Sequence, residues 1–299
     1  MGAGHGHGHA GARHRWRLGV SFALVAGFFV VELIVGLVSG SLALLSDAGH
    51  MAADVVALGA ALTATTIASR PDRTGRRTYG SYRVEVFASG FTVLLMLGVS
   101  VYVMVEAASR IGDPASVSFG PMLLVGALGL LVNVACLFLL RSGSRESINV
   151  KGAYFEVVAD AVGSVGVLLG GLLVGLTGAS AWDTGVAVSI GVFVAVRAIL
   201  LGREVLSVLG QHAPRDVDLR ALVNDLEALP AIAEIHDVHA WTLTSGMNVA
   251  TAHLVLRVGA DSGEVLQQAQ SILRDQHRIE HATLQVEADP TRECHSATW

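Results

Sequence analysis

Two pairs of ionisable residues lie inside long runs of apolar residues. Glu156 and Asp160 are four residues apart in the run that begins at Ala153, and His50 and Asp54 have the same spacing in an earlier run. Residues four apart share one face of a helix, and ionisable groups inside a membrane span are functional candidates. Two such pairs supply four ligands, the number that a tetrahedral divalent ion such as zinc takes. One imidazole and three carboxylates therefore predict a divalent-metal site.

Other polar residues in these apolar runs are less strongly indicated as metal ligands. Asp47 lies three residues before His50 on the same face, where it could be a second-shell partner that orients the imidazole. Glu32, Glu106 and Asn133 are isolated in their runs, which favours helix packing or an interfacial role. Buried polar contacts between helices are the alternative reading of the two pairs themselves.

The composition indicates an integral membrane protein. Of 299 residues, 52% are hydrophobic and 15% are charged, against about 25% charged in a soluble domain. A spanning helix needs roughly 20 apolar residues, and six such runs occur near 17–38, 41–69, 84–110, 118–140, 153–177 and 183–202. We expect six transmembrane helices in a domain over residues 16–205, with the lipid bilayer as a partner and no nucleic acid.

Basic residues set the expected orientation, because they are concentrated in cytoplasmic loops. Arginines and one lysine cluster before the first run, after the second and the fourth, and just after the sixth, whereas the opposite loops hold almost none. Both termini should therefore be cytoplasmic.

Residues 206–290 have the composition and periodicity of a small soluble domain. Two amphipathic helical segments and three alternating strand segments follow in the order α-β-β-α-β, which suggests a ferredoxin-like α+β fold, an antiparallel sheet with its helices on one face. The segment contains no phosphate loop, nucleophile elbow or HExxH, and we expect no enzymatic activity. Residues 291–299 form a C-terminal tail.

The N-terminal residues 1–15 alternate histidine with glycine at His5, His7 and His9. A tract of this composition cannot form a core and binds metal weakly. We expect a cytoplasmic arm that collects metal and is not essential.

Three long motifs occur in order along the chain: "SLALLSDAGHMAADVVALGAAL", "RRTYGSYRVEVFASG" and "NVKGAYFEVVADAVGSVGVLLGGLL". They resemble the cation diffusion facilitator family, in the bacterial zinc, cadmium and cobalt exporter branch related to the vesicular zinc transporters. The resemblance implies a homodimeric antiporter that exports divalent metal from the cytoplasm in exchange for protons. It places the transport site at His50, Asp54, position 156 and Asp160, and it implies a location in the plasma membrane.

Glu156 departs from the pattern of that branch, which has histidine at this position. With all side chains ionised and a dication bound, the site would carry one surplus negative charge, which is costly in a low dielectric. One carboxylate should then stay protonated, or a nearby cation must compensate. We hypothesise that Glu156 and His50 exchange protons for metal. Zinc is the first expected substrate. Replacing imidazole by carboxylate favours harder ions such as cobalt(II), manganese and iron(II) as alternatives, and cadmium is a further alternative.

The soluble domain carries further candidate metal ligands, which the resemblance associates with metal binding and the dimer interface. They are His236, His239, His253, His281, Glu287 and Asp289, with Cys294 and His295 in the tail. Zn²⁺ or another divalent ion is thus expected as substrate and as a ligand of this domain, with no other cofactor. A membrane metal sensor or scaffold that binds without transport is the rival function.

Overall fold

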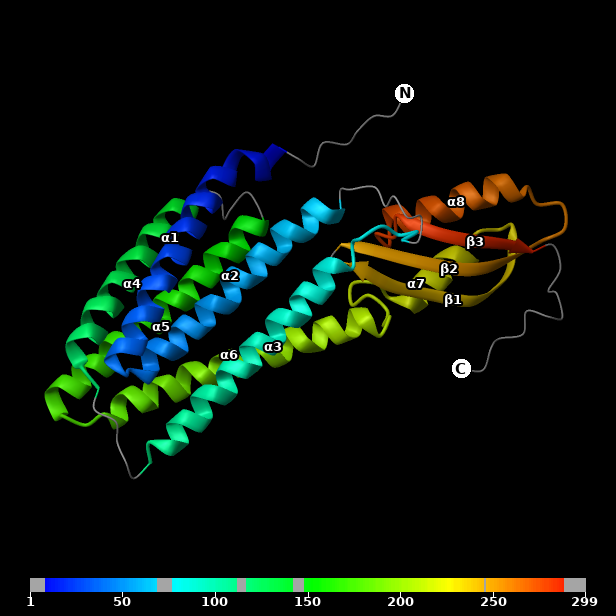
Figure 1. Ribbon diagram of the computed structural model, residues 1–299. Helices are drawn as coiled ribbons and strands as arrows, with labels where there is room; N and C mark the ends of the chain where they lie inside the picture. Colours follow the sequence, from blue (N-terminus) through cyan, green and yellow to red (C-terminus); the bar gives the residue numbers. More distant parts are fainter. Residues whose placement is uncertain (1–8, 69–76, 112–116, 142–147, 245, 288–299) are drawn as a thin grey trace. The chain divides into compact units, whose positions relative to one another are not determined.

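The computed structural model describes residues 9–68, 77–111, 117–141, 148–244 and 246–287 (Figure 1). The chain divides into two compact units, one built from residues 1–60 and 91–201 and the other from residues 61–90 and 202–299. The long helices are α1 His9–Ser39, α2 Leu42–Ala68, α3 Val84–Ser109, α4 Phe119–Leu140, α5 Ile148–Thr177 and α6 Ala181–Leu209.

The six helices match the six apolar runs, with differences at their ends. α1 begins at His9, inside the segment expected to be an unstructured arm, because Ala10, Ala12 and Arg13 are good helix formers. In the described residues, five helices are long and apolar enough to cross a membrane. α2 has 27 residues and carries the polar set around His50. The membrane domain thus has five to six candidate spans.

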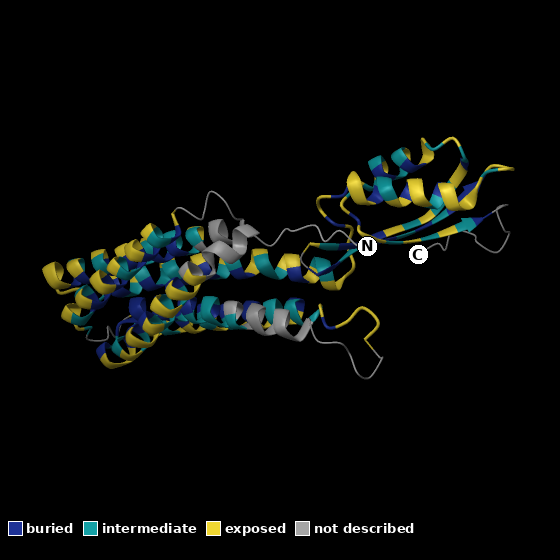
Figure 2. Cartoon of the chain, turned by 90° about the horizontal axis from the view of Figure 1, so that it is seen from above, coloured by how far each residue is buried: buried dark blue, intermediate teal, exposed yellow. Residues whose placement is uncertain are grey.

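The helices carry their large apolar residues outward as well as inward. Leu94 is 69% exposed and Phe138 is 71% exposed, and exposed residues run along the outer faces of the helices (Figure 2). Water would disfavour so large an apolar surface, whereas lipid accommodates it. The outer faces are therefore consistent with a bilayer environment.

Asp183, at the start of α6, fixes the N-terminus of α2. Its carboxylate accepts hydrogen bonds from Ser41 Oγ at 2.6 Å, Leu42 N at 2.8 Å and Ala43 N at 3.1 Å. These backbone groups have no partner within the helix itself. Arg110 Nη1 lies 3.3 Å from Asp183 Oδ2, so a fully buried carboxylate is both paired and hydrogen-bonded. The contact sets the position of α2 relative to α6.

The soluble domain contains α7 Leu219–Glu227, β1 Ile232–Thr244, β2 Met247–Leu256, α8 Ser262–Asp275 and β3 His281–Glu287, in the expected order. Both helices begin where an aspartate caps them: Asp218 accepts from the backbone N–H groups of Arg220 and Ala221, and Asp261 caps α8 in the same way. Capping of this kind stabilises a helix by about 1 kcal/mol.

The sheet has the order β1-β2-β3, but it is mixed and not antiparallel as expected. β1 and β2 form an antiparallel pair, whereas β3 runs parallel to β2. The reason is the connection: α8 carries the chain back across one face of the sheet, so the next strand starts from the same end. The α+β class is confirmed, and the direction of the third strand is corrected.

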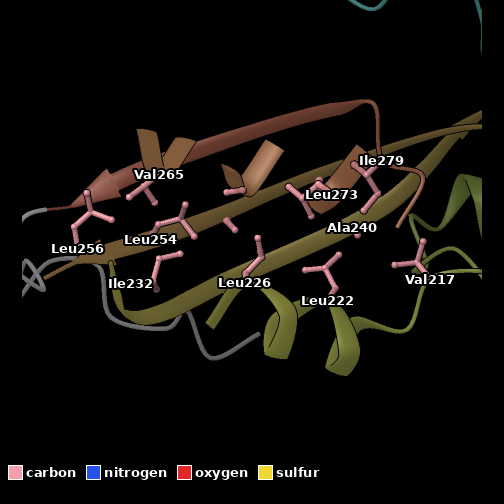
Figure 3. Close-up of a cluster of buried hydrophobic side chains, with 13 residues drawn as sticks. Val217, Leu222, Leu226, Ile232, Ala240, Leu254, Leu256, Val265, Leu273 and Ile279 are labelled. Atoms are coloured by element: carbon pink, nitrogen blue, oxygen red, sulfur yellow. The ribbon is translucent and has the colours of Figure 1, made fainter. Parts of the chain in front are cut away.

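Both helices of this domain pack on one face of the sheet. Leu222 and Leu226 of α7 and Leu273 of α8 share a buried cluster with Leu254 and Leu256 of β2 (Figure 3). Successive strand residues point to opposite faces, so the odd-numbered residues of β2 lie on the face without helices. That face carries the histidine of this strand.

Candidate metal centre

A cluster of three metal-type ligands, two buried and one partly buried, joins α2 and α5. His50 Nε2 lies 3.7 Å from Asp54 Oδ2 and 3.5 Å from Asp160 Oδ1, and one ligand atom from each of the three residues lies within 4.8 Å of the others. His50 is 2% exposed and Asp160 is 5% exposed. Imidazole and carboxylate donors gathered at this spacing are suited to a divalent cation.

Several atoms of the cluster are buried without a hydrogen-bond partner among the residues described. They are His50 Nδ1, Asp54 Oδ2 and Asp160 Oδ1. Buried polar atoms are normally satisfied, so unpaired atoms in a native structure call for an explanation. Carboxylate oxygens that face each other without donors are expected where a cation belongs.

A glycine brings the two helices of the cluster together. A Cβ atom added at Gly163 of α5 would lie only 2.8 Å from Asp47 Oδ1 of α2, so the close approach depends on the missing side chain. The four-residue spacing then aims His50 and Asp54 toward α5. Sequence spacing thus fixes each pair, and helix packing brings His50 and Asp54 to Asp160.

Glu156 does not join this cluster, although the sequence reading placed it among the four ligands. Its Oε1 accepts a hydrogen bond from Arg197 Nη2 of α6 at 2.7 Å. Arg197 Nη1 also lies 3.2 Å from His50 Nε2. The sequence reading overlooked Arg197, although a lone arginine within an apolar run is a sufficient signal. The nearby cation that the surplus charge required is therefore present.

Asp47 does not contact the imidazole in the expected way, because His50 Nδ1 has no hydrogen-bond partner in the described chain. The Asp47 side chain instead forms a hydrogen bond with Glu32 of α1. Both carboxyl groups are buried, with residue exposures of 3% and 1%. Glu32 is therefore not isolated, and the pair connects α1 to α2.

A second cluster of metal-type ligands lies on the helix-free face of the soluble domain. His236 of β1 and His253 of β2 are directly opposed across the antiparallel ladder. His253 Nδ1 lies 2.8 Å from Glu287 Oε1, and His236 Nε2 lies 3.6 Å from Glu287 Oε2. Both ring nitrogens of His236 and Glu287 Oε2 lack hydrogen-bond partners among the described residues. Three of the candidate ligands, His236, His253 and Glu287, thus lie close together here.

The electrostatics of this second cluster keep Glu287 ionised. Desolvation acts to raise the pKa of Glu287, but the hydrogen bonds from His253 and Gln285, with the charges of His236 and His253, outweigh it. The net effect is a pKa below the ordinary value of glutamate. An ionised carboxylate is the form that binds a metal ion.

The other predicted positions of this domain lie apart from the cluster. His239 is opposite Thr251, beyond a bulge in β1, and its Nε2 lies 2.9 Å from Asp237 Oδ1. His281 packs edge-on against Tyr79 with ring centroids 5.6 Å apart. Asp237 was missed by the sequence reading, although its Oδ2 lies 3.7 Å from His253 Nε2.

Some predicted ligands fall outside the described residues. They are His5, His7, Asp289, Cys294 and His295, and His9 is described only as the first residue of α1.

Comparison with known proteins defines the class. Residues 18–209 match the family described as the cation efflux transmembrane domain, and residues 214–289 match the cytoplasmic domain of cation efflux proteins. The chain belongs to this family, the cation diffusion facilitators. It is a multi-pass membrane transporter with a cytoplasmic C-terminal domain, and not an enzyme.

Individual relatives match over nearly their full length. The metal cation efflux system protein CzcD of Cupriavidus metallidurans is 40% identical, over 99% of this chain and 94% of the relative. Zinc transporter ZitB of Escherichia coli is 34% identical over 93% of this chain and 90% of its own. The cadmium, cobalt and zinc/H(+)-K(+) antiporter of Bacillus subtilis is 31% identical, over 90% of this chain and 88% of the relative.

The solved structures that match this chain include an isolated cytoplasmic domain. The metal-bound C-terminal domain of the CzcD transporter, from the same species as the first relative, is 36% identical. It covers 24% of this chain and 99% of its own, with a TM-score of 0.23.

Proposed function

We propose that this chain exports divalent transition-metal cations, zinc foremost, from the cytoplasm in exchange for protons. The observation that carries the proposal is the His50, Asp54 and Asp160 cluster between α2 and α5. The relatives named for zinc, cadmium and cobalt support this range of substrates. Cobalt, cadmium, manganese and iron(II) remain alternative substrates of the same site.

Proton coupling follows from the chemistry of the ligands. Imidazole and carboxylate groups must be deprotonated to bind a metal ion, so protons and metal compete for the same atoms. Metal entering from the cytoplasm displaces protons, and protons arriving from the other side displace the metal once the helices have moved. The proton gradient then drives efflux against the metal gradient.

The soluble domain is assigned a second metal site and the dimer contact. His236, His253 and Glu287 provide three ligands on the helix-free face of the sheet, and the match to the cytoplasmic domain family supports a homodimer. We also propose that both termini are cytoplasmic, on the distribution of basic residues. A location in the plasma membrane is proposed on the resemblance to bacterial metal exporters.

Flux into proteoliposomes that enclose a metal-responsive dye tests the function. Under an imposed proton gradient, wild type should transport zinc and Asp160→Asn should not. Asp216→Asn is the matched control, because Asp216 is an exposed aspartate of the soluble domain. Zinc binding without flux by the wild type would instead support a sensor or scaffold.

A further inference from the structure

Arg197 of α6 reaches the edge of the candidate transport site. Its Nη2 atom lies 2.7 Å from Glu156 Oε1, and its Nη1 atom lies 3.2 Å from His50 Nε2. The guanidinium carbon is 5.9 Å from the centre of the Phe193 ring. Arginine stays protonated in proteins, so the site has a permanent positive charge beside its imidazole.

The ion pair changes the charge balance of the site. Asp54, Asp160 and Glu156 together carry three negative charges, and a dication would leave one of them uncompensated. With Arg197 included, the metal-free site carries two negative charges once all of its carboxylates are deprotonated, and the loaded site is neutral. Neutrality matters because an uncompensated charge is costly inside a membrane domain.

The same contact determines which side chains face the metal. Both oxygens of Glu156 lie 2.7 Å from Arg197 Nη2, and Glu156 is not part of the three-ligand cluster. The guanidinium therefore holds the one unusual carboxylate of the site as its own partner. The two aspartates are left to meet the cation, and His50 Nε2 joins them by exchanging its 3.2 Å contact with Arg197 Nη1 for the metal.

We propose that Arg197 is a positioning residue that sets the metal affinity of the site, by compensating the charge of Glu156 and keeping it from ligating. The inference rests on the proposed function. In this proposal the Glu156–Arg197 ion pair has no net charge and so acts on the metal as one neutral side chain would. Zinc affinity should then follow the net charge of the empty site, and the two partners should have opposite effects when changed singly.

Zinc titration of the full-length protein in lipid nanodiscs tests this order of affinities. It is carried out at one fixed pH and with His253→Ala in every variant, because His253 belongs to the second three-ligand cluster, in the soluble domain. Arg197→Gln leaves three negative charges and should bind zinc about tenfold more tightly, and Glu156→Gln leaves one and should bind about tenfold more weakly. The tenfold size allows for partial exposure of the pair, whose side chains are 27% and 45% accessible. The double variant should return to within about threefold of wild type.

Arg197→Lys keeps the charge and is the matched control, with an affinity near that of wild type. An ion pair that serves only to hold the helices together would give losses in the same direction for both single variants. That result, or no change in either, would overturn the inference. If Arg197→Gln does not fold, the Glu156→Gln variant is sufficient for the test. Zinc binding by Glu156→Gln that is unchanged or tighter than wild type would contradict the predicted dependence on net charge.

A His50→Ala titration separates this inference from the proposed function. If His50→Ala binds zinc with wild-type affinity, the proposed transport site itself is refuted. If His50→Ala loses zinc binding but the zinc affinities of the Arg197 and Glu156 variants do not follow the predicted order, only the role assigned to Arg197 is refuted.

Discussion

Replacement of Asp183 by alanine should destabilise the membrane domain and disturb the transport site from a distance. Asp183 is fully buried, and it accepts three hydrogen bonds from the start of α2 in addition to its contact with Arg110. In Asp183→Ala, the N-terminal N–H groups of α2 and the Arg110 charge lose their common partner. The positions of α2 and α6 then lose their main polar connection.

The size of the effect can be worked out from these contacts. Hydrogen bonds to a charged group contribute about 1.5–3 kcal/mol each, but three bonds to one carboxylate are not additive. Removal of one partner of a buried pair costs about 3–5 kcal/mol, and we expect a loss in this range. In the variant, Arg110 keeps its ion pair with Glu106, whose Oε1 lies 3.3 Å from Arg110 Nε. We therefore expect a loss near the lower end of this range.

Denaturant unfolding of the full-length protein in micelles measures this loss. Ser189→Ala is the control on the same helix, because its exposed hydroxyl donates a hydrogen bond to the backbone oxygen of Gly185, its one partner among the residues that the structure describes. Arg197 lies fourteen residues after Asp183, roughly 21 Å along α6, so weakened zinc binding in Asp183→Ala would be an indirect effect. A variant within about 1 kcal/mol of wild type would refute the reasoning.

Three further predictions concern the soluble domain and the approach of α2 and α5. His253→Ala should abolish zinc binding by the soluble domain, measured by titration of the full-length protein in which Asp160→Asn removes the membrane site, whereas His239→Ala should leave it intact. Because the pKa of Glu287 is lowered, its contribution to stability is present above about pH 4.3 and is lost as the pH falls through the lowered value. Denaturation curves of wild type and Glu287→Gln should therefore converge in acid, and curves equally separated at all pH values would contradict this. Gly163→Ala should impair zinc flux, because a carboxylate oxygen of α2 lies 2.8 Å from the new Cβ, whereas Gly166→Ala meets only Val186 Cγ1 at 3.7 Å and should transport normally.

The elements and one half of the transport site could be predicted from the sequence. Apolar runs of about 20 residues specify membrane helices because lipid offers no partner to an exposed backbone. Helical periodicity alone places His50 and Asp54 on one face of α2. In the soluble domain, helical periodicity and strand alternation marked every helix and strand, and His236, His253 and Glu287 were among the candidate ligands.

What the sequence could not supply was the pairing between elements. The parallel direction of β3 follows from the path of α8, and the pairing of Glu287 with His253 follows from that direction. His239 matched the same pattern as His236 but contacts Asp237 beyond a bulge, because one extra residue in β1 shifts the register.

The transport site shows the same division. The sequence by itself determined that an imidazole and three carboxylates lie within the membrane helices, since local spacing and hydropathy depend only on neighbouring residues. Only the tertiary structure decided that Glu156 faces Arg197 and not the cluster. That choice depends on the packing of α6 beside α2 and α5, which brings together residues 41 positions apart, and no local pattern encodes a contact of that range.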